Sequence, residues 1–402
     1  MSQLKKRLPT WEFALILLCT IYFIVPGVAA MFPFYVFLFI EILYSSYLIL
    51  KSHVKATTFL KFAGLIVLVA LLYTFLNDAG SISAFVSNRL LKRFISKFMQ
   101  YSCMFFPLIF LIRFIQSASN KQSKTLIITA IASFVLASIP VLQMIAIDPL
   151  AARDFGQEQE GNFIPPYPFV YGMTFVFVAS FIFIKQANHK CFSLRIFSLL
   201  VFLFSFYFLV QSQFTLSLVT SFITIIFIIT YGMKGAGTRL VFLYFTFLLI
   251  CVLPFILEYL VIPYVPDMLA SRFEEVQDFF TGNLSDESDL SGRFELYGKS
   301  IVAFFQSPLI GNRYLDFDGH ATYLMVWADL GILGGVTVFS LLFRSKKLVE
   351  SLLSDAAPLF LPCFVHLFLN GLTNPIHASL QIYITLWFLI PLTLYTYKSK
   401  LI

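Results

Sequence analysis

His320 is the residue of this chain best placed for proton transfer. It stands just before an apolar run that starts at residue 321, where a helix is expected, and Asp318 is positioned to cap that helix. The positive end of a helix dipole disfavours imidazolium, so the ring should stay neutral near neutral pH and accept a proton as a general base. The alternative is an interfacial histidine without a chemical role, which is the commoner case for a single histidine.

Arginines in the polar segments could bind phosphate oxygens, because the planar guanidinium donates paired hydrogen bonds. Four such arginines are Arg153, Arg272, Arg293 and Arg313. Outside a cell membrane, a diphosphate would be carried by a lipid. The alternative is a set of ordinary salt bridges, because each arginine has an acid nearby: Asp154, Glu274, Glu295 and Asp316. That alternative is stronger for any single arginine, and the two are balanced for Arg293 together with His320.

The composition places these residues in a membrane protein. Of 402 residues, 59% are apolar and only 12% are charged, with a net charge of +7 and a mean hydropathy of +0.86. Soluble chains average about 45–50% apolar and about 25% charged residues. A soluble globular protein, a disordered chain and a nucleic-acid-binding protein are therefore excluded. The five cysteines match no metal-binding spacing, so neither a disulfide framework nor a structural zinc is expected.

Apolar runs long enough to span a bilayer predict an all-α, polytopic integral membrane protein with about twelve transmembrane helices. The runs are 11–30, 32–50, 59–76, 100–116, 124–146, 165–184, 194–211, 213–232, 239–261, 321–343, 356–374 and 378–397. Residues 1–261 thus hold spans one to nine, residues 262–320 form a large polar loop, and residues 321–402 hold spans ten to twelve. The first run resembles a signal peptide, but another span follows at once, so we interpret it as a retained helix.

Lysine and arginine in the short loops set the expected orientation. They recur at six points that share one side if both termini are cytoplasmic, which leaves loop 262–320 outside. Segment 82–99 is the exception, because four basic residues there fall on the outer side. Its apolar residues recur at helical spacing, which predicts an amphipathic helix lying in the membrane interface. A simple surface anchor is favoured over a platform for lipid phosphates.

A few residues inside the spans are candidates for special roles. Charged residues within spans are functional candidates by default, although those near helix ends are often paired; here they are Glu12, Glu41, Arg113 and Asp329. Glu12 and Arg113 lie near span ends and carry little weight, and Asp329 is interpreted as a buried polar tie. Three glycines, Gly331, Gly334 and Gly335, predict close helix–helix packing. A transporter is disfavoured, because the spans show neither a ladder of ionisable residues nor a matched pair of broken helices.

The motifs around the candidate residues are similar to a known family. They are Ser291-Gly292-Arg293, Leu296-Tyr297, Ser307-Pro308-Leu309-Ile310-Gly311, Asp318-Gly319-His320, Tyr323-Leu324 and Leu330-Gly331-Ile332-Leu333-Gly334. In this order and spacing they resemble the bacterial O-antigen polymerase and O-antigen ligase superfamily. The specific match covers about residues 290–343, and the expected spans and large loop agree with it over the whole chain.

The resemblance implies glycosyl transfer at the periplasmic face of the bacterial inner membrane. The donor would be a glycan on undecaprenyl diphosphate, with Arg293 holding the diphosphate and His320 activating the acceptor hydroxyl. Arg153, Arg272 and Arg313 become candidate substrate-binding residues. Neither a metal nor another cofactor is implied. The implied partners are membrane lipids, a chain-length regulator and a flippase, and no nucleic acid.

The family divides into polymerases and ligases, and the chain departs from the ligase pattern. Ligases usually carry an arginine in the short turn between spans seven and eight, which here reads Gln211-Ser212-Gln213-Phe214-Thr215. Polymerases carry arginine segments in two periplasmic loops. The sequence supplies Arg153, with Gly156 and Gly161 after it, and Arg272, with Gly282 after it. A polymerase is therefore favoured. A ligase is the alternative, and a non-catalytic polysaccharide or lipid transporter is the second alternative.

Overall fold

The described part of this chain is helical, and its longest helices suit a membrane. The computed structural model describes residues 7–31, 34–78, 88–103, 105–147, 166–186, 192–212, 215–231, 235–256, 289–312, 321–374 and 379–398, with positions 259, 263, 270, 274, 277–278 and 283. Six stretches there are long and apolar enough to cross a membrane, and five shorter apolar helices have 10–17 residues. The fold is thus all-helical, as predicted, whereas the count of twelve spans stays a prediction.

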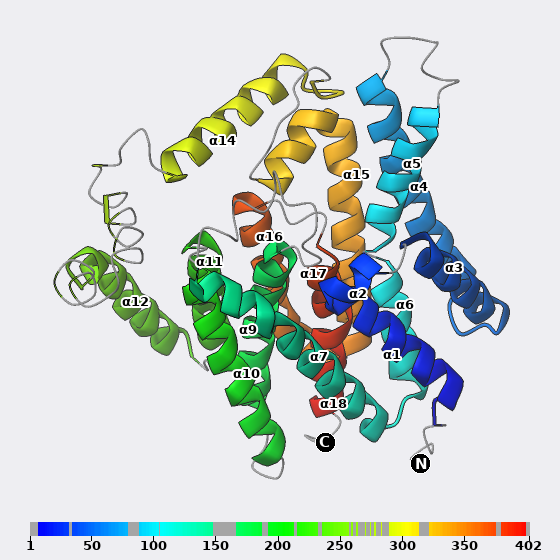
Figure 1. Cartoon of the computed structure of the whole chain (residues 1–402), viewed down its shortest axis with the longest axis horizontal. Helices are drawn as coiled ribbons and strands as arrows, with labels where there is room; N and C mark the ends of the chain where they lie inside the picture. The colour runs from blue at the N-terminus through cyan, green and yellow to red at the C-terminus, as the bar shows by residue number, and fades with distance from the viewer. Residues whose placement is uncertain are drawn as a thin grey trace.

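The first half of the chain and the segment just after it form helices that Figure 1 shows in blue to green. They are α1 (Thr10–Ile24), α2 (Pro26–Met31), α3 (Phe34–Leu50), α4 (Ala56–Asp78), α5 (Asn88–Ser102), α6 (Phe106–Ser117), α7 (Asn120–Ile147), α9 (Pro166–Gln186), α10 (Phe192–Gln211) and α11 (Thr215–Tyr231). The predicted first span is divided, because Val25 is extended and Pro26 starts a new helix.

The second half holds the helices that flank the candidate residues. They are α12 (Ala236–Ile256), α14 (Asp289–Gln306), α15 (Thr322–Leu353), η5 (Ser354–Ala356), α16 (Ala357–Thr373), α17 (Leu380–Ile384), η7 (Thr385–Leu389) and α18 (Ile390–Lys398). The start of α1 and the end of α18 lie at the same end of the molecule, and α14 lies across the opposite end (Figure 1).

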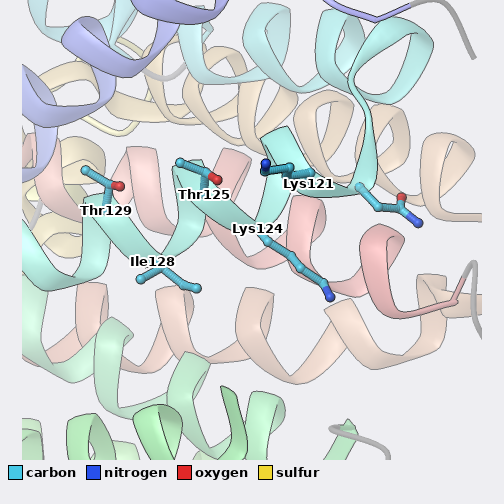
Figure 2. A pocket seen from close by; sticks show the side chains of 6 residues that line it. Lys121, Lys124, Thr125, Ile128 and Thr129 are labelled. Atoms are coloured by element: carbon cyan, nitrogen blue, oxygen red, sulfur yellow. The ribbon is translucent and has the colours of Figure 1, made fainter. Parts of the chain in front are cut away.

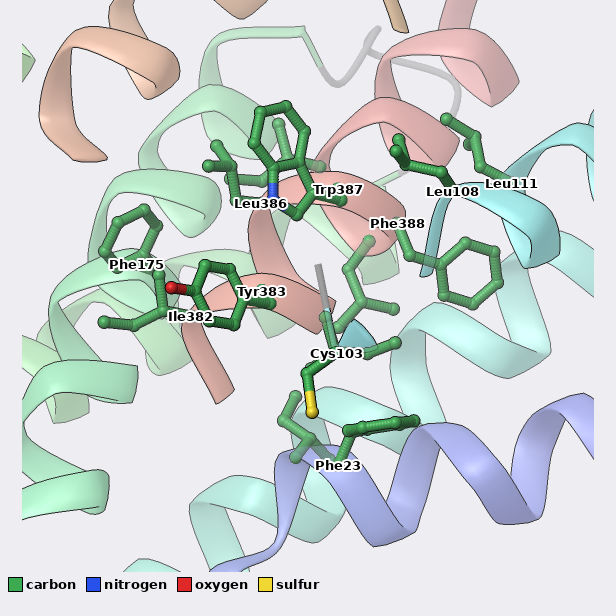
Figure 3. Packing of buried hydrophobic residues seen from close by; sticks show 14 of the residues in the cluster. Phe23, Cys103, Leu108, Leu111, Phe175, Ile382, Tyr383, Leu386, Trp387 and Phe388 are labelled. Atoms are coloured by element: carbon green, nitrogen blue, oxygen red, sulfur yellow. The ribbon is translucent and has the colours of Figure 1, made fainter. Parts of the chain in front are cut away.

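The core centres on the C-terminal helices α17, η7 and α18. Trp387 and Phe388, on a turn of π-helix, are completely buried. Figure 3 shows side chains from several helices packed around them, including Phe23 of α1 and Phe175 of α9. In lipid, apolar surface gives little drive for helices to associate, so tight packing of this kind carries much of the tertiary stability.

The amphipathic helix predicted near 82–99 has a packing partner. Residues 82–87 lie outside the described part of the chain, and α5 runs from Asn88 to Ser102. It packs along α4 (Figure 1). Lys97 on α5 places its ammonium 4.5 Å from the ring centroid of Tyr73 on α4. The C-terminal part of this helix therefore belongs to the helix bundle, and its depth in the membrane stays a prediction.

Candidate functional site

The predicted site residues fall mainly outside the described part of the chain. Arg153, Arg272, Arg313 and His320 all lie outside it. Arg293 lies in the second turn of α14, although its side chain is not among the described ones. The geometry of the site is therefore the geometry of the elements that flank these residues.

Residues 313–320, which include Arg313 and His320, connect two anchored points. At the first, the Asn312 backbone N–H donates to the Ala328 carbonyl at 2.7 Å. At the second, Thr322 donates to the Asn374 carbonyl through its backbone N–H at 3.3 Å and its hydroxyl at 3.0 Å. The two ends of this eight-residue connection are thus fixed to α15 itself and to the end of α16.

Helix α15 is broken at Gly331, which has φ 58° and ψ −158°. This conformation is essentially restricted to glycine. The amides freed by the break find acceptors in the turn after α14: Ile332 N–H donates to the Pro308 carbonyl at 2.8 Å, and Leu333 N–H to the Leu309 carbonyl at 3.3 Å. Inside a bilayer such replacement bonds are required, because no water is present to satisfy the backbone.

Two glycines allow this turn and the break in α15 to touch. A Cβ at Gly331 would lie 2.5 Å from the Leu309 carbonyl carbon, and a Cβ at Gly311 (φ 78°) would overlap the Asp329 backbone. The sequence predicted helix–helix packing at Gly331, Gly334 and Gly335, but the atoms nearest to these three glycines do not come from another helix. Gly331 meets a turn, whereas Gly334 and Gly335 lie against the side chains of Leu330 and Trp327 of their own helix. The break brings these segments of α15 together.

Polar side chains from three helices gather near the break, and we call Tyr73, Lys97, Tyr101 and Asp329 the break cluster. Tyr101 donates its hydroxyl to the Tyr73 hydroxyl at 3.4 Å. Half-buried Asp329 is close enough to interact electrostatically with both phenols. The cluster therefore combines a carboxylate, an ammonium and two phenols, which can donate and accept hydrogen bonds to polar groups. Asp329 is half-buried rather than buried, and its role as a polar tie stays a prediction.

Glu295, the acid nearest Arg293 in the sequence, pairs with Lys299 in the described part of the chain. Its carboxylate lies 2.6 Å from the Lys299 ammonium one turn along α14. The hydrogen bond and charge of Lys299 lower the pKa of Glu295 below its ordinary value. Both side chains are more than half exposed, at 57% and 67%, so this pair adds little stability.

Glu12 and Arg113 form a buried ion pair between α1 and α6. The guanidinium donates to both carboxylate oxygens, from Nε at 2.6 Å and from Nη2 at 2.9 Å. Tyr44 of α3 donates its hydroxyl to the same carboxylate at 3.1 Å, and Ser117 accepts from Arg113 at 2.6 Å. Bidentate pairs of this kind are the stronger ones. These two charges, which we gave little weight, tie three helices together.

A second buried polar group, centred on His366 of α16, was missed by the sequence analysis. Its Nδ1 lies 2.8 Å from the Thr224 hydroxyl of α11, and the Asn370 amide nitrogen lies 3.0 Å from its Nε2. The Phe175 ring of α9 packs 4.6 Å from the imidazole, centroid to centroid. The available signal was a histidine and an asparagine four residues apart inside an apolar run.

One open pocket with basic side chains lies on α7, away from the break. It measures about 450 Å³ and includes Lys121, Lys124, Thr125 and Thr129 from the first turns of the helix (Figure 2). None of its residues belongs to the predicted site. We therefore interpret it as a feature of the helix surface rather than as part of the candidate site.

No protein-family model matches this chain, and the search of curated proteins finds no match. The interpretation of the site therefore depends on the residues themselves and on the way the described elements hold them.

Proposed function

We propose that this protein is a polymerase of O-antigen or a related surface polysaccharide. It would join undecaprenyl-diphosphate-linked repeat units at the periplasmic face of a bacterial inner membrane, with both termini in the cytoplasm. The observation that carries the proposal is the crossing at Gly311 and Gly331. There, two segments of the motif series, one on α14 and the following turn and one on α15, are in direct backbone contact.

The proposed chemistry assigns complementary roles to Arg293 and His320. His320 accepts the proton of the acceptor hydroxyl as that oxygen forms a bond to the anomeric carbon of the donor glycan. The bond from that carbon to the lipid diphosphate breaks, and Arg293 stabilises the negative charge that develops on the leaving group. Arg153, Arg272 and Arg313 would contact the substrate. Membrane lipids, a chain-length regulator and a flippase are the proposed partners.

The test is complementation of a strain that lacks the gene, followed by a lipopolysaccharide gel. The strain should make core with a single repeat unit and no ladder, and the wild-type gene should restore the ladder. His320→Ala should fail to restore it at normal membrane abundance. Arg293→Lys should lose most activity, because a point charge replaces a bidentate fork.

His53→Ala is the matched control, because His53 lies in the turn between α3 and α4, away from the motif series. It should restore the ladder fully. Bare core with long polymer left on the lipid carrier would indicate a ligase. A full ladder from His320→Ala would refute the assigned base.

A further inference from the structure

A groove runs along α15 beyond its break. It has a volume of about 330 Å³ and is lined mainly by α15 itself. Its wall is formed by Val336, Phe339 and Phe343, and Trp327 closes the end nearest the break. The Trp327 ring packs 5.7 Å from the Phe304 ring of α14, centroid to centroid. The groove therefore starts where α14 meets α15 and leads away from the candidate site.

The spacing of the wall residues shows that the groove extends along α15 for about the thickness of one membrane leaflet. Positions 336, 339, 343 and 347 recur at intervals of three and four, which places them on one face of a helix. Eleven residues at about 1.5 Å each extend roughly 16 Å, about half of a hydrocarbon core of about 30 Å. Val336 is 52% exposed and Phe343 is 48% exposed, so this face is open to the surrounding medium.

Two exposed cations, Arg344 and Lys347, stand at the far end of the groove. Within the part of the chain that the structure describes, neither forms an ion pair. Lys346 between them differs, because its ammonium pairs with Glu350 at 2.6 Å and lies 5.8 Å from the Phe364 ring centroid. An apolar wall that ends in two uncompensated cations is complementary to an acyl chain with an anionic head group.

We propose that this groove binds one anionic phospholipid of the bilayer. Its phosphate lies against Arg344 and Lys347, and one acyl chain covers Val336, Phe339 and Phe343. Clusters of basic residues at the end of a membrane helix attract anionic lipids in this way. A net-neutral phospholipid fits the same wall but gains less from the cations, so the site should select by head-group charge.

The test is native mass spectrometry of the purified full-length protein in detergent, titrated with phosphatidylglycerol or phosphatidylcholine. Wild type should retain one phosphatidylglycerol more tightly than phosphatidylcholine. The Arg344→Gln/Lys347→Gln variant should bind phosphatidylglycerol roughly tenfold more weakly and lose the preference. Raising salt from about 0.1 M to about 1 M should weaken wild type and leave this variant nearly unchanged.

Two further variants separate charge, shape and folding. Lys51→Gln/Lys55→Gln removes two exposed cations from the turn between α3 and α4 and should keep the wild-type preference. Phe343→Ala should weaken both lipids to a similar degree, because it removes acyl-chain contact and leaves both cations in place. A wild-type preference in the Arg344→Gln/Lys347→Gln variant, or an equal loss in the control, would overturn the proposal.

Discussion

At the scale of single residues, the charges inside the spans occupy three different surroundings. Glu12 and Arg113 neutralise one another, and Asp329 lies beside the phenols of the break cluster. Glu41 buries both carboxylate oxygens with no hydrogen-bond partner among the described residues. Residue type was therefore a poor guide to role, because the surroundings are set by helices distant in sequence.

Arg113→Ala should destabilise the protein by about 3–5 kcal/mol. The substitution leaves the Glu12 carboxylate buried without its counter-charge, which is the costly way to break a buried pair. Thermal unfolding of the purified protein in detergent measures the effect as a lower melting temperature.

The control is the double variant Glu12→Gln/Arg113→Met, which removes both charges and should recover much of the lost stability. Glu41→Gln offers a second comparison, because an amide there avoids the cost of an uncompensated carboxylate. If Arg113→Ala were as stable as the wild type, the ion pair of Glu12 and Arg113 would contribute nothing to stability.

At the residue scale, the sequence does not show which charged or polar side chains inside the spans contact one another. Glu12 and Arg113 are 101 positions apart, and no local pattern links them. His366 escaped notice because its partner Thr224 is 142 positions away on another helix. Hydropathy places residues within spans but says nothing of which spans are neighbours.

At the scale of elements, boundaries marked by helix-breaking residues were predictable and the break in α15 was not. Helix α14 ends at Gln306, just before Ser307 and Pro308, and the residue before a proline disfavours helical geometry. The tenth span was expected to run unbroken over 321–343. Both sides of Gly331 are mainly apolar, so hydropathy does not reveal the break. The contact with the turn after α14 makes the break favourable.

Gly331→Ala should disrupt the join between α14 and α15. Alanine at φ 58° carries about 1–3 kcal/mol of backbone strain, and its methyl group overlaps the backbone around Leu309. The expected result is a lower melting temperature in detergent and, under the proposed function, shorter polysaccharide chains on the gel.

Gly64→Ala on α4 is the matched control, because nothing lies within 4 Å of a Cβ added there. It should leave melting temperature unchanged or slightly raised, since alanine favours helix over glycine. If Gly331→Ala and Gly64→Ala had the same melting temperature, the contact between the turn after α14 and the break in α15 would contribute nothing to stability.

At the scale of the whole molecule, the arrangement of the ends bears on topology. The start of α1 and the end of α18 lie at one end of the molecule, and α14 lies at the opposite end (Figure 1). Composition alone predicted the class of the protein, because apolar runs of this length are rare in soluble chains. It could not give the number of crossings, because several helices are shorter than the roughly 20 residues that a bilayer core requires.

Cysteine labelling should place α14 outside and the turn between α3 and α4 inside. Lys299→Cys, on the exposed face of α14, should react with a membrane-impermeant thiol reagent in whole cells. Lys51→Cys should react only after the membrane is permeabilised.

The background for this experiment replaces Cys191 and Cys251 by serine. Three cysteines have described side chains, which are free and buried: Cys19, Cys103 and Cys363. The parent without an added cysteine provides the blank. Labelling of both positions from outside, or of Lys51→Cys alone, would contradict the proposed orientation.

The ion pair between α1 and α6 also constrains biosynthesis. At about 5–20 residues per second, roughly 5–20 s separate the synthesis of Glu12 from that of Arg113. During that interval α1 enters the insertion machinery with its carboxylate uncompensated. The nascent chain should therefore keep its first helix near the machinery until the sixth emerges. A ribosome stalled before residue 113 should leave α1 extractable, whereas one stalled after α6 has emerged should leave it firmly integrated.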